Sequence, residues 1–236
     1  MNKKIRAGAL SLAFFFAGTA ALASEPQNMG SGPSAAKKTA TTTFSTPEEY
    51  ELKGERTVRL DDSVNRTTAV DLIRKLRFLD AHNPDNKEIV LVINSGGGNV
   101  DQGLAILDTL RNLKSDVRTV CEGRAMSMAA ILLAAGTPGK RTSLPNCRIM
   151  FHQLSAGNSG TFSEMDNNHE QFAKMNENLM GIVSRLTNRT KADVTKALKQ
   201  DVYFNPDQAL DFGAIDSVVS PSRPLPDAGQ RAFNIP

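Results

Sequence analysis

The sequence predicts an α/β domain built on a parallel sheet, with a long helix as an appendage. Short apolar runs such as 89–94 and 148–152 have the length and composition of buried strands. Segments with apolar residues at helical spacing alternate with these runs, which favours strand–helix–strand units and a parallel sheet. After Gly160 the pattern changes to one long amphipathic stretch, which predicts the appended helix.

The expected elements follow one another in a regular order. Strand propensity and apolar content predict the strands, and a spacing of three to four between apolar residues predicts the helices. We expect Ser163 to cap the long helix and Gly213 to end the last one. The expected strands are 57–60, 89–94, 117–122, 148–152 and 215–219, and the expected helices are 66–82, 103–113, 127–135, 164–186, 191–199 and 206–212.

Both ends of the chain differ in composition from the predicted domain at 48–220. Residues 1–23 combine a basic start, an apolar run and the small-residue pattern Ala21-Leu22-Ala23, which predicts a signal peptide cleaved near Ala23. Residues 24–47 are rich in small and polar residues, which predicts a flexible arm, and 221–236 form a proline-rich, irregular tail. The protein is therefore expected to be exported, either to a periplasm or out of the cell.

Charge and cysteine content exclude some classes of protein. The formal charge of +3 becomes zero once the three basic residues of the signal peptide are removed, so no basic surface for nucleic acid is expected. The three histidines lack the carboxylate or cysteine spacing of a metal site. Export would permit a bridge between Cys121 and Cys147, but their apolar surroundings favour two buried, unbridged cysteines.

Two predicted strand-to-helix turns carry residues suited to catalysis. Ser95-Gly96-Gly97-Gly98 follows a buried strand, where glycines let backbone N–H groups approach a ligand, but its spacing is wrong for a dinucleotide site. Ser127 stands where a helix amino terminus offers free N–H groups to developing negative charge. The local pattern alone fits a nucleophile or a plain helix cap at Ser127.

A serine nucleophile needs a base and a group that orients the base. His82 and His169 lie in polar segments typical of the surface, whereas His152 ends an apolar strand at the sheet edge expected to hold Ser127. The local pattern fits two roles for His152, a general base or a half-buried structural histidine. Asp193 and Asp201 are both possible orienting acids, and the strand-forming residues after Asp201 favour a rigid position for it.

Five segments resemble, in order and spacing, the proteolytic subunit of the Clp protease. The resemblance covers about residues 50–220 and assigns the catalytic serine, histidine and aspartate to Ser127, His152 and Asp201. It implies an oxyanion hole formed by the backbone N–H groups of Gly98 and Met128. The segments are LVINSGGG (91–98), GLAILDT (103–109), AMSMAAILLAAG (125–136), GKRTSLPNCRIMFH (139–152) and GAID (213–216).

The resemblance also implies a fold and an assembly. It implies a crotonase-like (ClpP-type) repeated β-β-α spiral, with 164–186 as the handle helix, and a homo-oligomer of paired heptameric rings. The chain departs from the usual family residues at Gly96, Ala129 and Leu154, which puts substrate preference in doubt more than reaction type.

These observations predict a serine endopeptidase that hydrolyses peptides or unfolded polypeptides without a cofactor. An exported copy would meet no ATP, so an ATP-driven unfoldase is not expected as its partner. One alternative is a catalytically quiet scaffold or peptide-binding ring of the same fold. Another is acyl-thioester chemistry of the crotonase type, which would need coenzyme A and leave the three matched residues unexplained.

Overall fold

A seven-stranded sheet organises the residues that the computed structural model describes, 56–157 and 159–223. The predicted signal peptide and arm and most of the predicted tail lie outside this range. The strands are β1 (Thr57–Leu60), β2 (Ile89–Ser95), β3 (Val117–Met126), β4 (Arg141–Ser143), β5 (Arg148–Phe151), β6 (Val202–Phe204) and β7 (Ser217–Val218). The helices are α2 (Arg66–Ala81), α3 (Val100–Asn112), α4 (Met128–Ala134), α5 (Phe162–Thr187), α6 (Lys191–Ala197) and α7 (Pro206–Phe212).

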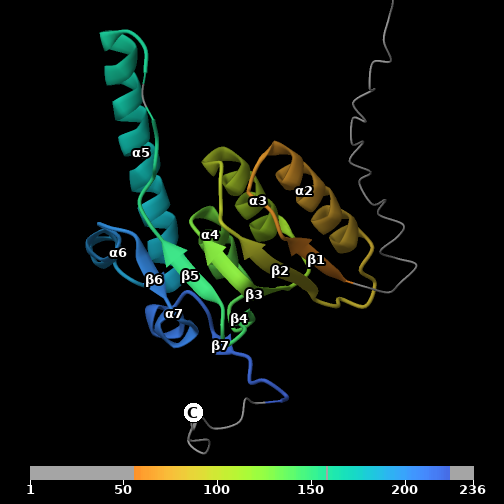
Figure 1. The fold of residues 1–236 in the computed structure, drawn as a ribbon. Helices are drawn as coiled ribbons and strands as arrows, with labels where there is room; N and C mark the ends of the chain where they lie inside the picture. The colour runs from red at the N-terminus through yellow and green to blue at the C-terminus, as the bar shows by residue number, and fades with distance from the viewer. Residues whose placement is uncertain (1–55, 158, 224–236) are drawn as a thin grey trace, which may run out of the picture. The chain divides into compact units, whose positions relative to one another are not determined.

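The sheet confirms the predicted α/β class. Strands β1, β2, β3, β4 and β7 follow one another in parallel, and β5 pairs with β3 and β6 off this path. Only the β5–β6 pair among the described strands is antiparallel. Helices α2, α3 and α4 lie on one face (Figure 1), and every side chain of α4 is buried.

Strand β3 branches the sheet. Its residues 119–121 pair with β4, whereas residues 124–126 pair with β5. Gly123 lies between these two segments with φ 78°, opposite a register irregularity in β2. A Cβ atom at Gly123 would lie 2.9 Å from Asn94 Oδ1, so this turn requires glycine. The branch carries β5 alongside the carboxyl end of β3.

Helix α5 begins earlier than predicted and has a different cap. Thr161, and not Ser163, caps the helix, and its partner Glu164 completes a capping box. The carboxyl-terminal half packs on the domain through Leu179, Met180 and Val183. The amino-terminal half extends beyond the sheet (Figure 1), and Phe162 is 83% exposed there. Each helix within residues 56–157 and 159–223 is too short or too polar to cross a membrane.

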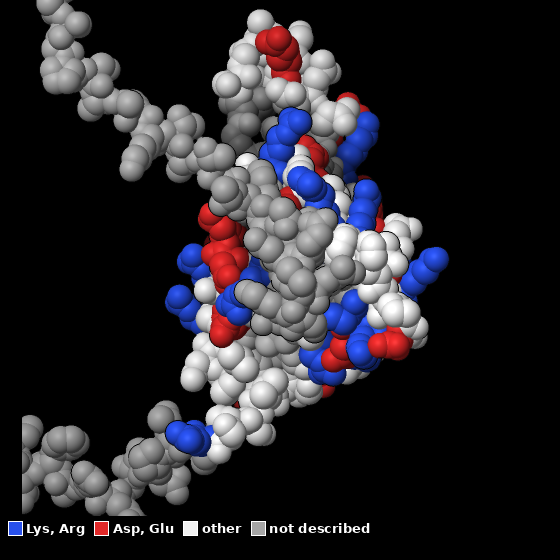
Figure 2. All heavy atoms as spheres, turned by 90° about the vertical axis from the view of Figure 1, so that its right-hand side faces the viewer, with Lys and Arg blue, Asp and Glu red and all other residues white. Residues whose placement is uncertain are grey.

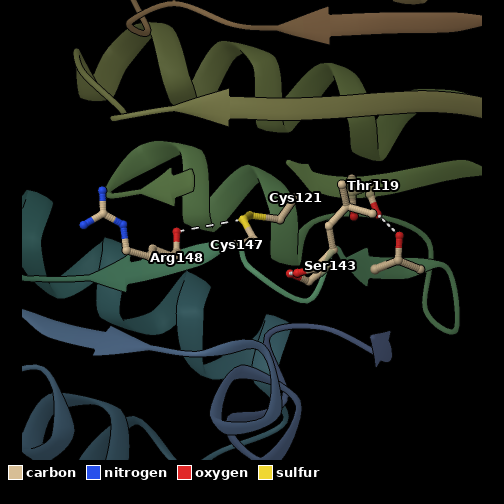
Figure 3. Close-up of a disulfide and its surroundings, with 7 residues drawn as sticks. Thr119, Cys121, Ser143, Cys147 and Arg148 are labelled. Atoms are coloured by element: carbon tan, nitrogen blue, oxygen red, sulfur yellow. Dashed lines mark hydrogen bonds between the residues drawn. A yellow bond between two sulfur atoms is a disulfide. The ribbon is translucent and has the colours of Figure 1, made fainter. Parts of the chain in front are cut away.

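A disulfide joins Cys121 of β3 to Cys147, immediately before β5 (Figure 3). The prediction of two unbridged cysteines was therefore wrong. Both residues are buried as predicted, and their Cα atoms lie 6.0 Å apart because β3 and the chain entering β5 run side by side. The bridge links the two strands whose carboxyl ends hold the candidate site.

Arg141 ties the ends of three helices to the sheet. Its guanidinium makes two bonds to the carboxylate of Asp216, at 2.5 and 2.9 Å. It also donates to the carbonyl groups of Leu186 in α5, Gly213 after α7 and Ala134 in α4, at 2.7, 2.9 and 3.4 Å. Burial would raise the pKa of Asp216, but the hydrogen bonds from Arg141 outweigh it and hold the pKa below its ordinary value.

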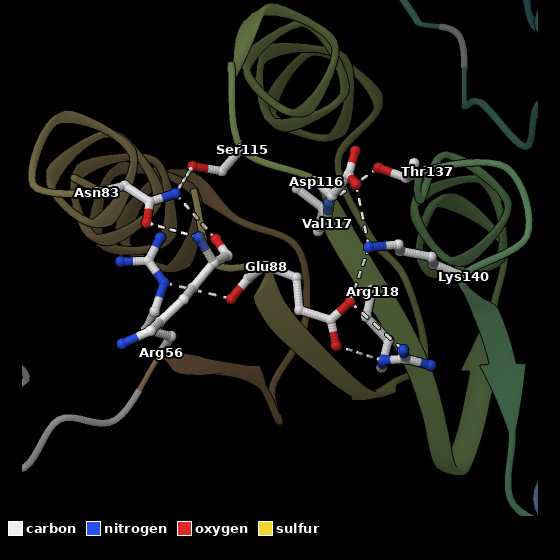
Figure 4. A network of polar contacts seen from close by, with 10 residues as sticks. Arg56, Asn83, Glu88, Ser115, Asp116, Val117, Arg118, Thr137 and Lys140 are labelled. Atoms are coloured by element: carbon white, nitrogen blue, oxygen red, sulfur yellow. Dashed lines mark hydrogen bonds and ion pairs between the residues drawn. The ribbon is translucent and has the colours of Figure 1, made fainter. Parts of the chain in front are cut away.

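A second polar network lies near the amino ends of β2 and β3 (Figure 4). Glu88 accepts from Arg118 at 2.8 Å and from Lys140 at 3.0 Å, and Lys140 also contacts Asp116. The hydrogen bond from Arg118 lowers the pKa of Glu88, against the effect of burial. On the face shown in Figure 2, basic and acidic side chains are intermixed, as the near-balanced charge of the sequence leads one to expect.

Candidate active site

Ser127 occupies a sharp turn between β3 and α4. Its backbone has φ 56° and ψ −126°, a region that residues other than glycine rarely adopt. The Ser127 side chain makes no capping bond to α4, although the residue stands at the N-cap position. Its backbone N–H donates to the Met150 carbonyl at 2.9 Å, which fixes the turn against β5. The hydroxyl is therefore held by a strained backbone and is not used to cap the helix.

His152 follows β5 and faces Ser127. Because Met126 pairs with Met150 in parallel register, the residues that follow these two strands emerge at the same sheet edge. His152 Nε2 lies 2.7 Å from Ser127 Oγ, within hydrogen-bond distance. The His152 side chain is 22% exposed, so the pair is accessible but largely sheltered. An imidazole unprotonated at Nε2 accepts the hydroxyl proton in this arrangement.

Asp201 reaches the same place through the β5–β6 pairing. The antiparallel register pairs Phe151 with Val202, so one further step sets His152 opposite Asp201. Asp201 Oδ1 lies 3.7 Å from His152 Nδ1, which is longer than a hydrogen bond. The Asp201 side chain is 59% exposed. The three predicted residues thus lie in a row. Ser127 and His152 are within hydrogen-bond distance, whereas His152 and Asp201 exceed it by a few tenths of an ångström.

The glycine-rich loop passes directly beside the serine turn. A Cβ atom on Gly97 would lie 2.5 Å from the Met126 carbonyl oxygen and 2.7 Å from Ser127 Cβ, so the close approach requires glycine. Gly98 forms a bridge with Val64, which anchors the loop to the chain after β1. Among the described residues, the backbone N–H groups of Gly98 and Met128 donate to no protein acceptor. Both remain available for a ligand.

An apolar pocket of about 290 Å³ opens between the serine turn, the glycine loop and α5. Leu154 forms part of its wall, and the Leu154 backbone N–H donates to Asn176 of α5 at 2.9 Å. The sequence patterns did not predict this pocket, although the apolar periodicity of α5 already indicated the residues that the helix contributes. Its apolar lining includes Val100, Met128, Ile131, Leu154, Leu179 and Val183.

The other titratable candidates lie elsewhere or have other partners. His82 Nδ1 lies 2.9 Å from the Phe78 carbonyl at the end of α2, and His169 is exposed on α5. Asp193 accepts from the Thr190 hydroxyl at 2.7 Å in the first turn of α6. Within the described residues, no group of three histidine, cysteine or acidic side chains could hold a metal ion.

The comparison with known protein families matches this part of the chain. The family model described as Clp protease covers residues 44–222, which include every element of the sheet and the whole candidate site.

Proposed function

This chain belongs to the Clp protease family, and we propose that it is a serine endopeptidase acting through a catalytic triad of Ser127, His152 and Asp201. The observation that carries the proposal is the 2.7 Å contact between Ser127 Oγ and His152 Nε2 at a strained strand-to-helix turn. Ordinary helix caps neither need this backbone strain nor place a histidine on the hydroxyl. The substrates we propose are peptides or already unfolded polypeptides.

The proposed reaction has two stages. His152 Nε2 takes the hydroxyl proton as Ser127 Oγ bonds to the substrate carbonyl carbon, and the oxyanion accepts from the N–H groups of Gly98 and Met128. The carbon–nitrogen bond then breaks, and His152 gives the proton to the leaving amine. Water next attacks the acyl-enzyme with His152 as base, which releases the acid and restores the serine. Asp201 stabilises the imidazolium through the other ring nitrogen.

The compartment and the assembly are part of the same proposal. The predicted signal peptide would place the enzyme outside the cytoplasm, where ATP is absent, so we propose that it works without an ATP-driven unfoldase. Homo-oligomers, such as paired heptameric rings, would cover the exposed half of α5, including Phe162. Recovery of the native protein in a cytoplasmic complex with an ATP-driven ring would overturn the proposal that it works outside the cytoplasm without an unfoldase.

A quiet scaffold of the same fold is the second candidate. The specific observation in its favour is the 3.7 Å separation of His152 and Asp201, together with the exposure of that carboxylate. If Asp201 orients His152, the charge-assisted bond should supply about 1.5–3 kcal/mol, or roughly 10- to 100-fold in rate.

Peptide hydrolysis by two matched variants distinguishes the candidates. Asp201→Asn should lose about 10- to 100-fold in kcat with the fold intact, whereas Asp193→Asn should keep wild-type kcat because Asp193 serves the α6 cap. Equal activity of Asp201→Asn and wild type would remove Asp201 from the mechanism. A folded, assembled wild-type protein that cleaves no peptide would support the scaffold.

A further inference from the structure

Two arginines stand side by side on the open face of the sheet, next to the candidate active site. Arg124 of β3 and Arg148 of β5 are register partners in a parallel pair, so their side chains leave the same face of neighbouring strands, which lie about 4.8 Å apart. Both are exposed, and the Arg148 side chain extends away from the disulfide (Figure 3). We call these two residues the arginine pair.

The arginine pair has no acidic partner among the described residues. Neither guanidinium makes an ion pair or a hydrogen bond there. The acid on the same face, Glu122, is engaged with Arg59 from β1. Like charges set directly across neighbouring strands are unfavourable, and this chain keeps two of them together without compensation. An anion bound between them would relieve that repulsion.

The arginine pair borders the pocket that holds Ser127. A Cβ atom on Gly96 would lie 3.9 Å from Arg124 Cζ, and Gly96 itself lines the pocket. Met150 also lines the pocket. Because Met150 follows Arg148 by two residues in β5, the two side chains lie on the same face of the strand. Arg124 precedes Ser127 by three residues, a separation of about 10 Å along a strand, and an extended peptide covers it in about three residues.

We infer that the arginine pair binds a substrate carboxylate and gives this enzyme a preference for an acidic group within about three residues of the scissile bond. This inference rests on the proposed peptidase function and adds a charge requirement to it. Guanidinium groups match carboxylates in planar, two-bond geometry, and such charge-assisted bonds are strong in a partly sheltered site. The carboxylate belongs either to an Asp or Glu side chain or to the substrate carboxyl terminus.

A paired peptide scan tests the inference with the full chain. One Glu is moved from three residues before to three residues after the cleaved bond of a quenched fluorescent peptide, and each peptide has a Gln twin. A further twin carries an amidated carboxyl terminus. We expect wild-type kcat/KM to favour the acid about tenfold at one position. A Glu effect there identifies a side chain, and an effect only of amidation identifies the terminus.

Charge variants assign the preference to the arginine pair. Arg124→Gln and Arg148→Gln should each bring the acid-to-amide ratio close to one. Arg118→Gln, which removes the same charge from the same face of β3 at its other end, should keep the ratio. Equal cleavage of every wild-type pair would overturn the inference while leaving the peptidase intact. Loss of the ratio in the Arg118 variant would overturn it as well, because general attraction would then explain the preference.

Binding separates this inference from the peptidase proposal. Fluorescence anisotropy with Ser127→Ala measures the affinity of the same Glu and Gln peptides without cleavage. Tighter binding of the acidic peptide, lost on adding Arg124→Gln, supports the arginine pair even if wild type cleaves nothing. Equal affinities for both peptides would overturn it, whatever the catalytic result.

Discussion

The backbone strain at Ser127 predicts that glycine stabilises the fold at this position. A residue other than glycine at such a backbone geometry costs about 1–3 kcal/mol. Glycine removes that strain but gives the unfolded chain more freedom, which offsets about 0.4–1 kcal/mol. The Ser127 hydroxyl makes no capping bond, so its removal adds no capping loss. Ser127→Gly should therefore be more stable than Ser127→Ala by about 1 kcal/mol.

Thermal unfolding of the two inactive variants measures this difference. For a domain of this size, 1 kcal/mol corresponds to about 2–4 °C in Tm. Ser163 supplies the matched control, because it lies in the first turn of α5 with an ordinary helical backbone. There, Ser163→Gly should melt below Ser163→Ala, since glycine weakens a helix by about 0.5–1 kcal/mol. A Tm of Ser127→Gly at or below that of Ser127→Ala would show that the backbone at Ser127 does not carry this strain.

Three further predictions concern the supporting structure. Gly97→Ala should abolish hydrolysis and lower the free energy of unfolding more than Gly139→Ala does. Gly139 also has a positive φ of 83°, but no atom lies within 4 Å of an added Cβ, so Gly139→Ala should lose only about 1–2 kcal/mol. Equal losses of the two variants in urea unfolding would exclude the clash at Gly97. Asp216→Asn should lose about 3 kcal/mol at pH 7. Because the folded pKa of Asp216 is depressed, that stabilisation is present above pH 3.8 and is lost as pH falls through the folded pKa, so a gap that persists in acid would contradict it. Replacing Cys121 and Cys147 by Ala should cost about 3.5 kcal/mol for a crosslink spanning 26 residues, and alkylation of both thiols without reductant would show that the bridge is absent.

Long periodic elements were predictable from the sequence, whereas the short strands β4 and β6 were not. The helices beginning at Arg66 and Pro206 and the strand beginning at Ile89 start where their apolar patterns start. β4 and β6 have three residues each, too few for a period, and exist because longer strands offer them an edge. The cap of α5 was misplaced because Thr161 and Ser163 are both suitable capping residues, and the capping-box partner Glu164 decides between them.

The sequence predicted the position of those site residues that directly follow an apolar strand. Apolar strands placed Ser127 and His152 at one sheet edge, and the structure brings them within hydrogen-bond distance. The strand-forming residues after Asp201 favoured it over Asp193, but its place beside His152 depends on the antiparallel β5–β6 register, which no local pattern contains. The disulfide depended in the same way on the branching of β3. Distant pairings of this kind require the folded topology.

The proposed mechanism requires that Ser127 is an activated nucleophile, which a covalent probe can test directly. Purified protein is treated with a fluorophosphonate probe, and the modified residue is located by mass spectrometry, with Ser127→Ala as the control. We predict labelling at Ser127 alone, abolished in the control and reduced in His152→Ala. Absence of labelling in the folded, assembled protein, or modification of a different residue, would contradict the proposed role of Ser127.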